Sequence, residues 1–279
     1  MRLKNLYSLL GFQNIDVMTI HDLDGHPKEV YIYDDHRYLL GILFVYWYLN
    51  KRGLNVVSFN RFDDYSYSLP KADLLKMIGV ANLAYAQDED FWRFMEFDMP
   101  YDNNNCITIG MQLGLINDSV SIGNSDILGI LSRNNRYQFA SEDIHRMFAI
   151  KHLKHELEHG MTLDVGTDHP NAMDIDGILG LHLIPNNKIP KHPYVLDIDL
   201  SCFTYDVKNG VSNCWPEFFF HEEFSDEISI YLENLIASAD IITIARSPKR
   251  CGGPGSSAKA LAYIDRYFFN GELRAVPIR

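Results

Sequence analysis

The chain has 279 residues, of which 47% are hydrophobic, so it is long enough to bury about three quarters of its unfolded surface without disulfide or metal staples. Its 25 basic residues against 37 acidic ones give a formal net charge of −12, which argues against a binder of nucleic acid or of anionic membranes and suits a cationic ligand. Four cysteines without a C-x-x-C pair, and an N-terminus without a signal-peptide pattern, indicate reduced thiols and a cytoplasmic protein.

Short β-rich runs alternate with longer helical patterns along the chain. The segments that we expect to form strands are 16–20, 29–33, 55–59, 119–123, 178–184, 194–200 and 240–246. The segments that we expect to form helices are 36–52, pieces within 70–115, 141–159, 225–239 and 256–268. This alternation predicts one domain, residues 1–279, folded as a three-layer α/β/α sandwich around a mostly parallel sheet.

The most apolar run of the chain is Tyr38–Leu49. It has 12 residues, whereas a membrane-spanning helix needs roughly 20. We therefore expect a buried core helix here and no membrane association.

Polar side chains follow three of the expected strands at the points where those strands end. They are Asp34, Asp35 and His36 after strand 29–33, Asn60, Asp63 and Asp64 after strand 55–59, and Asp197 and Asp199 in strand 194–200. The carboxyl ends of parallel strands meet at one edge of a sheet, where α/β proteins bind their ligands. Two carboxylates on one strand face need a cation or hydrogen bonds when buried, and the alternative is a strand end at which both acids are hydrated.

At these residues the chain resembles the arginase–deacetylase superfamily and, within it, the peptide arginases and their relatives. "YDDHRYLLG" (33–41) resembles the family motif G-G-D-H, with His36 as a metal ligand, and "DIDL" (197–200) resembles the motif D-x-D. Segments 102–123 and 243–248 are similar to segments of the peptide arginases. The resemblance implies an arginase-like fold and a Mn²⁺ site at which arginine side chains are hydrolysed to ornithine and urea.

The middle motif of the family, D-x-H-x-D, is only partly matched by "NRFDD" (60–64). Asn60 and Phe62 replace an aspartate and a histidine, and only Asp64 keeps its type. In arginases the first aspartate bridges two metal ions. Two divalent ions about 3.5 Å apart repel by roughly 19 kcal/mol at an effective dielectric constant of ~20, so the loss of a bridging charge is severe.

We therefore expect at most one well-bound ion, Mn²⁺ before other divalent metals. The metal ligands that the resemblance implies are His36, Asp64, Asp197 and Asp199. The acids that could hold a cationic guanidinium at the rim are Asp34, Asp35 and Asp63, and the sequence identifies no general base.

Three functions remain open. The first is a metal-dependent hydrolase of the guanidine group of an arginine-containing peptide or a small guanidine compound. The second is a catalytically inactive arginase-fold protein that binds an arginine-containing peptide. The third is a zinc protease, because His155 to His159 form an H-E-x-x-H pattern in which Glu156 is the candidate base. An apolar stripe on another side of that helix favours a surface helix instead, with both histidines facing solvent.

Overall fold

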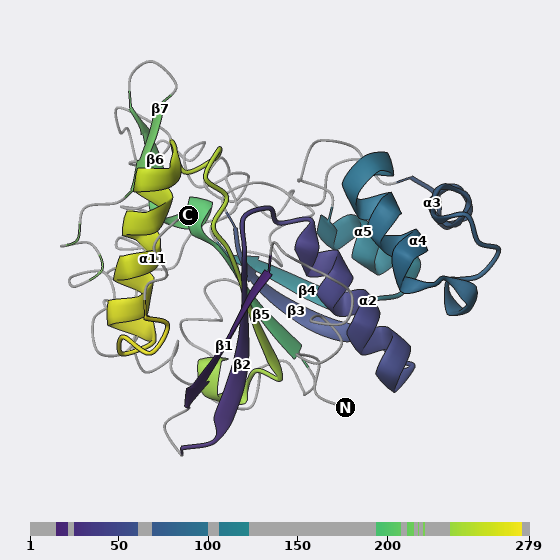
Figure 1. The fold of residues 1–279 in the computed structure, drawn as a ribbon, viewed down its shortest axis with the longest axis horizontal. Helices are drawn as coiled ribbons and strands as arrows, with labels where there is room; N and C mark the ends of the chain where they lie inside the picture. Colours follow the sequence, from purple (N-terminus) through teal and green to yellow (C-terminus); the bar gives the residue numbers. More distant parts are fainter. Residues whose placement is uncertain are drawn as a thin grey trace, which may run out of the picture.

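The computed structural model describes residues 15–21, 25–60, 69–99, 106–122, 194–207, 211–214, 217, 220 and 235–274. At its centre lies a six-stranded sheet with the strand order β1-β2-β8-β5-β3-β4 (Figure 1). The strands are β1 (Ile15–His21), β2 (Pro27–Tyr33), β3 (Leu54–Phe59), β4 (Ile116–Ile122), β5 (Tyr194–Asp199) and β8 (Ile241–Ala245). Every neighbouring pair is parallel except β1 and β2. This confirms the expected α/β class with a mostly parallel sheet.

The antiparallel pairing of β1 with β2 is the one departure from the parallel sheet, and it follows from the length of the connection. Residues 22–26 alone join the two strands, so Ile15 pairs with Tyr33 and His21 pairs with Pro27. A parallel pair needs a crossover of a dozen or more residues, which this connection is too short to provide.

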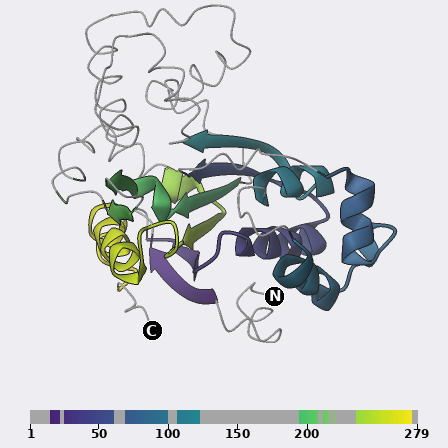
Figure 2. The same cartoon turned by 90° about the horizontal axis from the view of Figure 1, so that it is seen from above.

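Helices lie on both faces of the sheet (Figures 1 and 2). One face is covered by α2 (Tyr38–Asn50), α3 (Lys71–Ile78), α4 (Asp88–Arg93) and α5 (Cys106–Leu113), with the short helical turns η1 (Leu83–Tyr85) and η2 (Phe94–Asp98). The other face is covered by α11 (Pro254–Phe268), beside the hairpin of β6 (Thr204–Val207) and β7 (Val211–Cys214). A 3₁₀ turn, η4 (Leu200–Phe203), leads from β5 into that hairpin.

Two apolar cores separate these layers, and alternation along β5 connects them. Val195 belongs to the core under α2 and α5, whereas Leu196 and Ile198 belong to the core under α11. Because side chains alternate faces along a strand, Asp197 and Asp199 share the face of Val195. The two aspartates therefore lie between the sheet and the layer that contains α2 and α5.

The expected helix 36–52 forms as α2, whose residues from Tyr38 to Val45 are all buried. In the part of the chain that the structure describes, no helix has the length and apolar character needed to cross a membrane. The expected helix 256–268 forms as α11, which begins two residues earlier, with Pro254 at its first turn. The expected strand 178–184, the helix 141–159 and most of the helix 225–239 lie outside the described residues.

Candidate functional site

The ends of three parallel strands bring four polar side chains to one edge of the sheet, which we call the carboxyl edge. His36 lies between β2 and α2, Asp197 and Asp199 lie at the end of β5, and Asn60 directly follows β3. All four residues are fully buried. The two aspartates are thus not hydrated at a solvent-exposed strand end.

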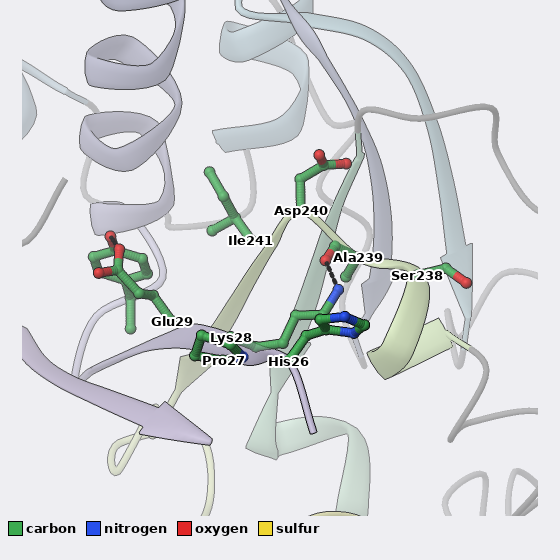
Figure 3. A pocket seen from close by; sticks show the side chains of 9 residues that line it. His26, Pro27, Lys28, Glu29, Ser238, Ala239, Asp240 and Ile241 are labelled. Atoms are coloured by element: carbon green, nitrogen blue, oxygen red, sulfur yellow. Dashed lines mark hydrogen bonds between the residues drawn. The ribbon is translucent and has the colours of Figure 1, made fainter. Parts of the chain in front are cut away.

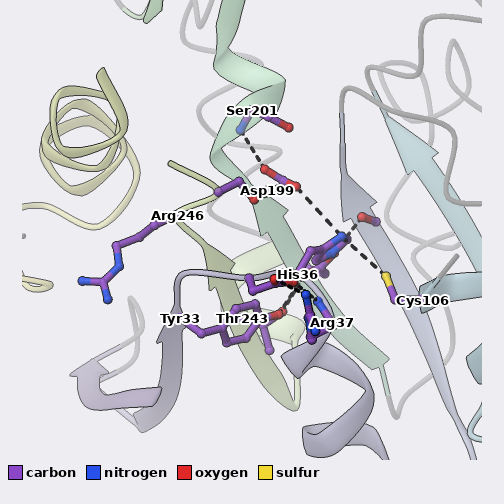
Figure 4. A network of polar contacts seen from close by, with 12 residues as sticks. Tyr33, His36, Arg37, Cys106, Asp199, Ser201, Thr243 and Arg246 are labelled. Carbon is purple, nitrogen blue, oxygen red and sulfur yellow. Dashed lines mark hydrogen bonds and ion pairs between the residues drawn. The ribbon is translucent and has the colours of Figure 1, made fainter. Parts of the chain in front are cut away.

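Asp197 is the centre of a buried hydrogen-bond network, whose members His36, Thr243 and Tyr33 are labelled in Figure 4. Its Oδ2 lies 2.7 Å from Nε2 of His36 and accepts a hydrogen bond of 2.7 Å from the Ser58 hydroxyl. Its Oδ1 accepts a 2.7 Å hydrogen bond from the Thr243 hydroxyl and a longer one, 3.4 Å, from Tyr33. Both carboxylate oxygens are therefore satisfied by groups of the chain itself, which compensates the cost of burying the charge.

Strand register explains why Ser58 and Thr243 contact the same carboxylate. Ser58 on β3 pairs with Asp197 on β5, and Asp197 pairs with Thr243 on β8. Residues opposite one another in neighbouring strands point to the same face, so the two hydroxyls flank the carboxylate from either side. Neither residue is predicted from the sequence. Their only signal is that each is a polar residue within a mostly apolar strand.

The pKa values in this network reflect burial and charge. Burial acts to raise the pKa of the Asp197 carboxyl, but the charge of His36 and the hydrogen bonds from His36, Thr243 and Ser58 outweigh it and hold the pKa below its ordinary value. Burial, followed by the negative charge of Asp197, raises the pKa of Tyr33 well above its ordinary value. Asp197 is therefore an anion at neutral pH, and Tyr33 keeps its proton.

Asp199 has a different set of contacts. Its Oδ1 accepts a 2.8 Å hydrogen bond from the backbone N–H of Ser201, and its Oδ2 accepts one of 3.1 Å from the Ser247 hydroxyl. The same Oδ2 lies 3.9 Å from Nδ1 of His36 (Figure 4). The hydroxyl oxygen of Ser201 is buried and has no hydrogen-bond partner in the structure as described. A buried hydroxyl without a partner normally binds water or another polar group.

Cys106 adds a sulfur to this site. It is the first residue of α5, it is fully buried, and its Sγ lies 3.5 Å from Nδ1 of His36 (Figure 4). The imidazole of His36 therefore has Asp197 on one ring nitrogen and Cys106 on the other. The sequence offers no signal for this contact, because Cys106 and His36 are 70 residues apart.

Two of the three acids expected at the rim, Asp34 and Asp35, are paired with arginines of the chain. Asp34 Oδ1 lies 2.6 Å from Nε of Arg246, whose Nη1 lies 3.7 Å from a carboxylate oxygen of Asp16. Asp35 Oδ2 lies 2.8 Å from Nη2 of Arg37. A substrate guanidinium that bound to Asp34 or Asp35 would therefore have to displace one of these arginines.

The described residues alone do not fit a metal ion. They include the expected ligands His36, Asp197 and Asp199, while Asp64, together with Phe62 and Asp63, lies outside them. Within the described ranges, no three His, Cys, Asp or Glu side chains are grouped in a way that could hold a metal. Asp197 would have to give up at least one of its present hydrogen bonds to become a ligand. The H-E-x-x-H segment from His155 to His159 also lies outside the described residues.

A pocket of about 340 Å³ lies at the opposite end of the strands, which we call the amino edge (Figure 3). It is lined by residues at the start of β2 and around the start of β8, among them Lys28 and Asp240. Lys28 donates from Nζ to the carbonyl oxygen of Ala239 at 2.9 Å, and Asp240 accepts a 3.0 Å hydrogen bond from the N–H of Tyr194. This open pocket is thus separate from the buried network around His36.

Comparison of the chain with protein-family models, with curated proteins and with solved structures found no match.

Proposed function

We propose that this chain is an arginase-like protein whose carboxyl edge binds the guanidinium group of an arginine side chain, in a peptide or in a small guanidine compound. The observation that carries the proposal is the pair of buried carboxylates, Asp197 and Asp199, placed on either side of the His36 imidazole in a chain of net charge −12. A buried anionic site favours a cationic ligand.

Asp199 is the better placed of the two carboxylates to receive a guanidinium. Three short contacts from His36, Ser58 and Thr243 already occupy the oxygens of Asp197. The Oδ2 of Asp199 accepts a hydrogen bond of 3.1 Å from Ser247, and it lies 3.9 Å from Nδ1 of His36, which is too far for a hydrogen bond. A charge-assisted hydrogen bond from a guanidinium would replace these weaker interactions. Because Asp199 is fully buried, a ligand enters only after neighbouring groups move aside.

The first candidate activity is hydrolysis of the guanidine to ornithine and urea, as the resemblance to the peptide arginases implies. A Mn²⁺-dependent version of this reaction needs ligands beyond those that the described residues arrange, and Asp64 is the residue expected to supply one. The sequence and the resemblance support this candidate.

The second candidate is binding of an arginine-containing peptide without hydrolysis. It is favoured by a specific observation, since the charge of Asp197 is balanced by His36 and two hydroxyl groups rather than left for a cation. Asn60, a neutral amide at the end of β3, also stands where the family pattern has an acid.

Calorimetric titration tests the binding that both candidates share. A short peptide with one arginine should bind at least about tenfold more tightly than the same peptide with citrulline, its neutral isostere, because only the guanidinium carries a charge. Asp199→Asn should remove this preference, and Asp240→Asn at the amino edge should keep it. Equal affinity for the two peptides would refute the proposal.

The products separate the two candidates. Protein purified without chelator is supplied with Mn²⁺ and the arginine peptide, and urea and ornithine are measured. Their formation supports the hydrolase, whereas binding without either product supports the second candidate.

A further inference from the structure

Cys106, His36 and Asp197 form a continuous row of side chains. The Sγ of Cys106 lies 3.5 Å from Nδ1 of His36, and Nε2 of the same ring lies 2.7 Å from Oδ2 of Asp197. All three residues are fully buried. They come from the start of α5, the loop after β2 and the end of β5, so the tertiary fold rather than local sequence brings them together.

The arrangement sets the direction of the hydrogen bonds. A carboxylate only accepts hydrogen bonds, so the ring nitrogen that faces Asp197, Nε2, carries the proton. In the neutral imidazole the other nitrogen, Nδ1, then has a lone pair, and this lone pair faces the thiol of Cys106. A nucleophile, a base and a group that orients the base are thereby placed in sequence, as in cysteine-dependent hydrolases.

A place for a cationic ligand adjoins this row. Nδ1 of His36 is the common neighbour of the Cys106 sulfur and of Oδ2 of Asp199, which lies 3.9 Å away. Ser201 donates its backbone N–H to Asp199, and its hydroxyl oxygen is buried with no hydrogen-bond partner within the described ranges. The Asp199 carboxylate therefore lies on the side of the imidazole that Cys106 contacts, and it is bonded to the backbone of Ser201, whose buried hydroxyl lacks a partner.

We propose that Cys106 is a nucleophile for the guanidinium carbon of an arginine side chain, with His36 as its base and Asp197 as the residue that positions His36. The substrate class rests on the proposed function, in which Asp199 holds the guanidinium, whereas the nucleophile rests on the geometry of the row alone. This route uses the residues that the structure places together and needs no metal ligand from outside them.

The step balances with water as the only co-reactant. The thiol proton passes to Nδ1 of His36 as the sulfur bonds to the guanidinium carbon. The bond from that carbon to the side-chain nitrogen then breaks, and the nitrogen takes the proton, which gives ornithine and an amidino group on Cys106. Water adds to the amidino carbon, the carbon–sulfur bond breaks and the sulfur regains a proton. Urea leaves, and no atom changes its oxidation state.

Alkylation with a matched pair of reagents tests the proposal on the full chain. 2-Chloroacetamidine carries a cationic amidine and 2-chloroacetamide is its neutral counterpart, and both alkylate a thiol with loss of chloride. Peptide mass spectrometry follows each cysteine, and the other three provide internal controls because they are also buried. Cys251 is as fully buried as Cys106, and its Sγ contacts the carbonyl oxygen of Arg246. Burial raises the pKa of Cys214 to about 12.

We expect 2-chloroacetamidine to alkylate Cys106 at least about tenfold faster than Cys251, because an adjacent base activates a thiol. His36→Gln should remove this advantage, whereas Cys214→Ser should leave it unchanged. Asp197→Asn should slow the alkylation of Cys106 without changing that of Cys214. A variant that merely loosened the fold would instead expose every buried thiol and speed the alkylation of both.

The outcomes test the role of Cys106 as nucleophile and the guanidinium as its substrate separately. If neither reagent alkylates Cys106 faster than Cys251, the assignment of Cys106 as a nucleophile is overturned. The peptide titration then still decides whether the proposed arginine site exists. Fast alkylation by both reagents without a preference for the cationic one supports the nucleophile and overturns the guanidinium as its substrate. A preference for 2-chloroacetamidine that Asp199→Asn removes supports both.

Discussion

The two edges of the sheet carry similar residues in opposite settings. At the carboxyl edge, His36, Asp197 and Asp199 are fully buried and contact one another. At the amino edge, Lys28 and Asp240 line an open pocket, and each bonds to backbone atoms nearby. Both edges use β2 and β8, so the difference lies in what covers the strand ends.

This difference shows that charge and open space are separate guides to a site. The pocket at the amino edge offers volume, but its polar groups complete the ends of secondary structure elements. At the carboxyl edge the described side chains are buried, and they depend on one another through short contacts between residues that are distant in the sequence. Removing one member of such a buried network costs more stability than removing a polar group near solvent, because the remaining buried groups cannot form hydrogen bonds with water instead.

Removing one carboxylate from each edge should produce the largest contrast. Asp197→Ala should lower the free energy of unfolding by about 3–5 kcal/mol, because it leaves the buried His36 and two hydroxyls without their acceptor. Urea denaturation monitored by circular dichroism measures the loss. A decrease of about 1 kcal/mol or less, the size of an ordinary single hydrogen bond, would mean that the network contributes little.

The hydroxyl donors should have intermediate effects. Ser58→Ala and Thr243→Val should each cost about 1.5–3 kcal/mol, the usual range for a hydrogen bond to a charged group. Since both donors serve Asp197, the double variant should lose less or more than the sum of the single variants, which a double-mutant cycle detects. Strict additivity would show that the two oxygens of Asp197 act independently.

Acid should weaken the carboxyl edge through Asp197. Its pKa in the folded chain lies below its ordinary value of about 3.9 in unfolded chains, so the ionised form favours the folded state. The stabilisation is complete at pH values well above that ordinary pKa and is lost as the pH falls through the lowered value in the folded chain. The difference in stability between the parent and Asp197→Asn should therefore shrink as the pH falls from about 5 through about 3.9 and below. A constant difference across this range would contradict the assignment.

The smallest effect should come from the amino edge. Asp240→Ala removes the acceptor for one backbone N–H, that of Tyr194, and should cost about 1 kcal/mol. Asp240→Asn keeps an acceptor oxygen and should cost less. A loss as large as that of Asp197→Ala would abolish the contrast between the two edges.

Much of the fold follows from local patterns in the sequence. The strands around Val57, Leu196 and Ile242 are apolar runs bounded by polar residues, which is typical of covered parallel strands. The hairpin of β6 and β7 is not predicted, although Tyr205 and Val207 alternate with polar residues and Asn209-Gly210 is a turn signal, because each strand has only four residues.

The candidate site, too, is only partly predicted from the sequence. The sequence places His36, Asp197 and Asp199 at strand ends, and the structure brings them together. It does not predict Ser58, Thr243 or Cys106, because their proximity depends on the strand order and on how α5 packs. In the sequence, Ser58 is 139 residues and Thr243 is 46 residues from Asp197, to which both hydroxyls donate. No local pattern encodes such a separation. The metal roles of His36, Asp64, Asp197 and Asp199 remain predictions.

The position of β5 between β3 and β8 has a consequence for how the chain folds during synthesis. His36 leaves the ribosome 161 residues before Asp197, which corresponds to on the order of ten seconds at usual translation rates. During that interval β2 can pair with β1 and β3 with β4, but the facing sides of β2 and β3 stay open, because β8 and β5 lie between them in the finished sheet. Unpaired strands attract other chains. Refolding should therefore be slow, and newly made chains should need protection by chaperones until residue 245 has emerged.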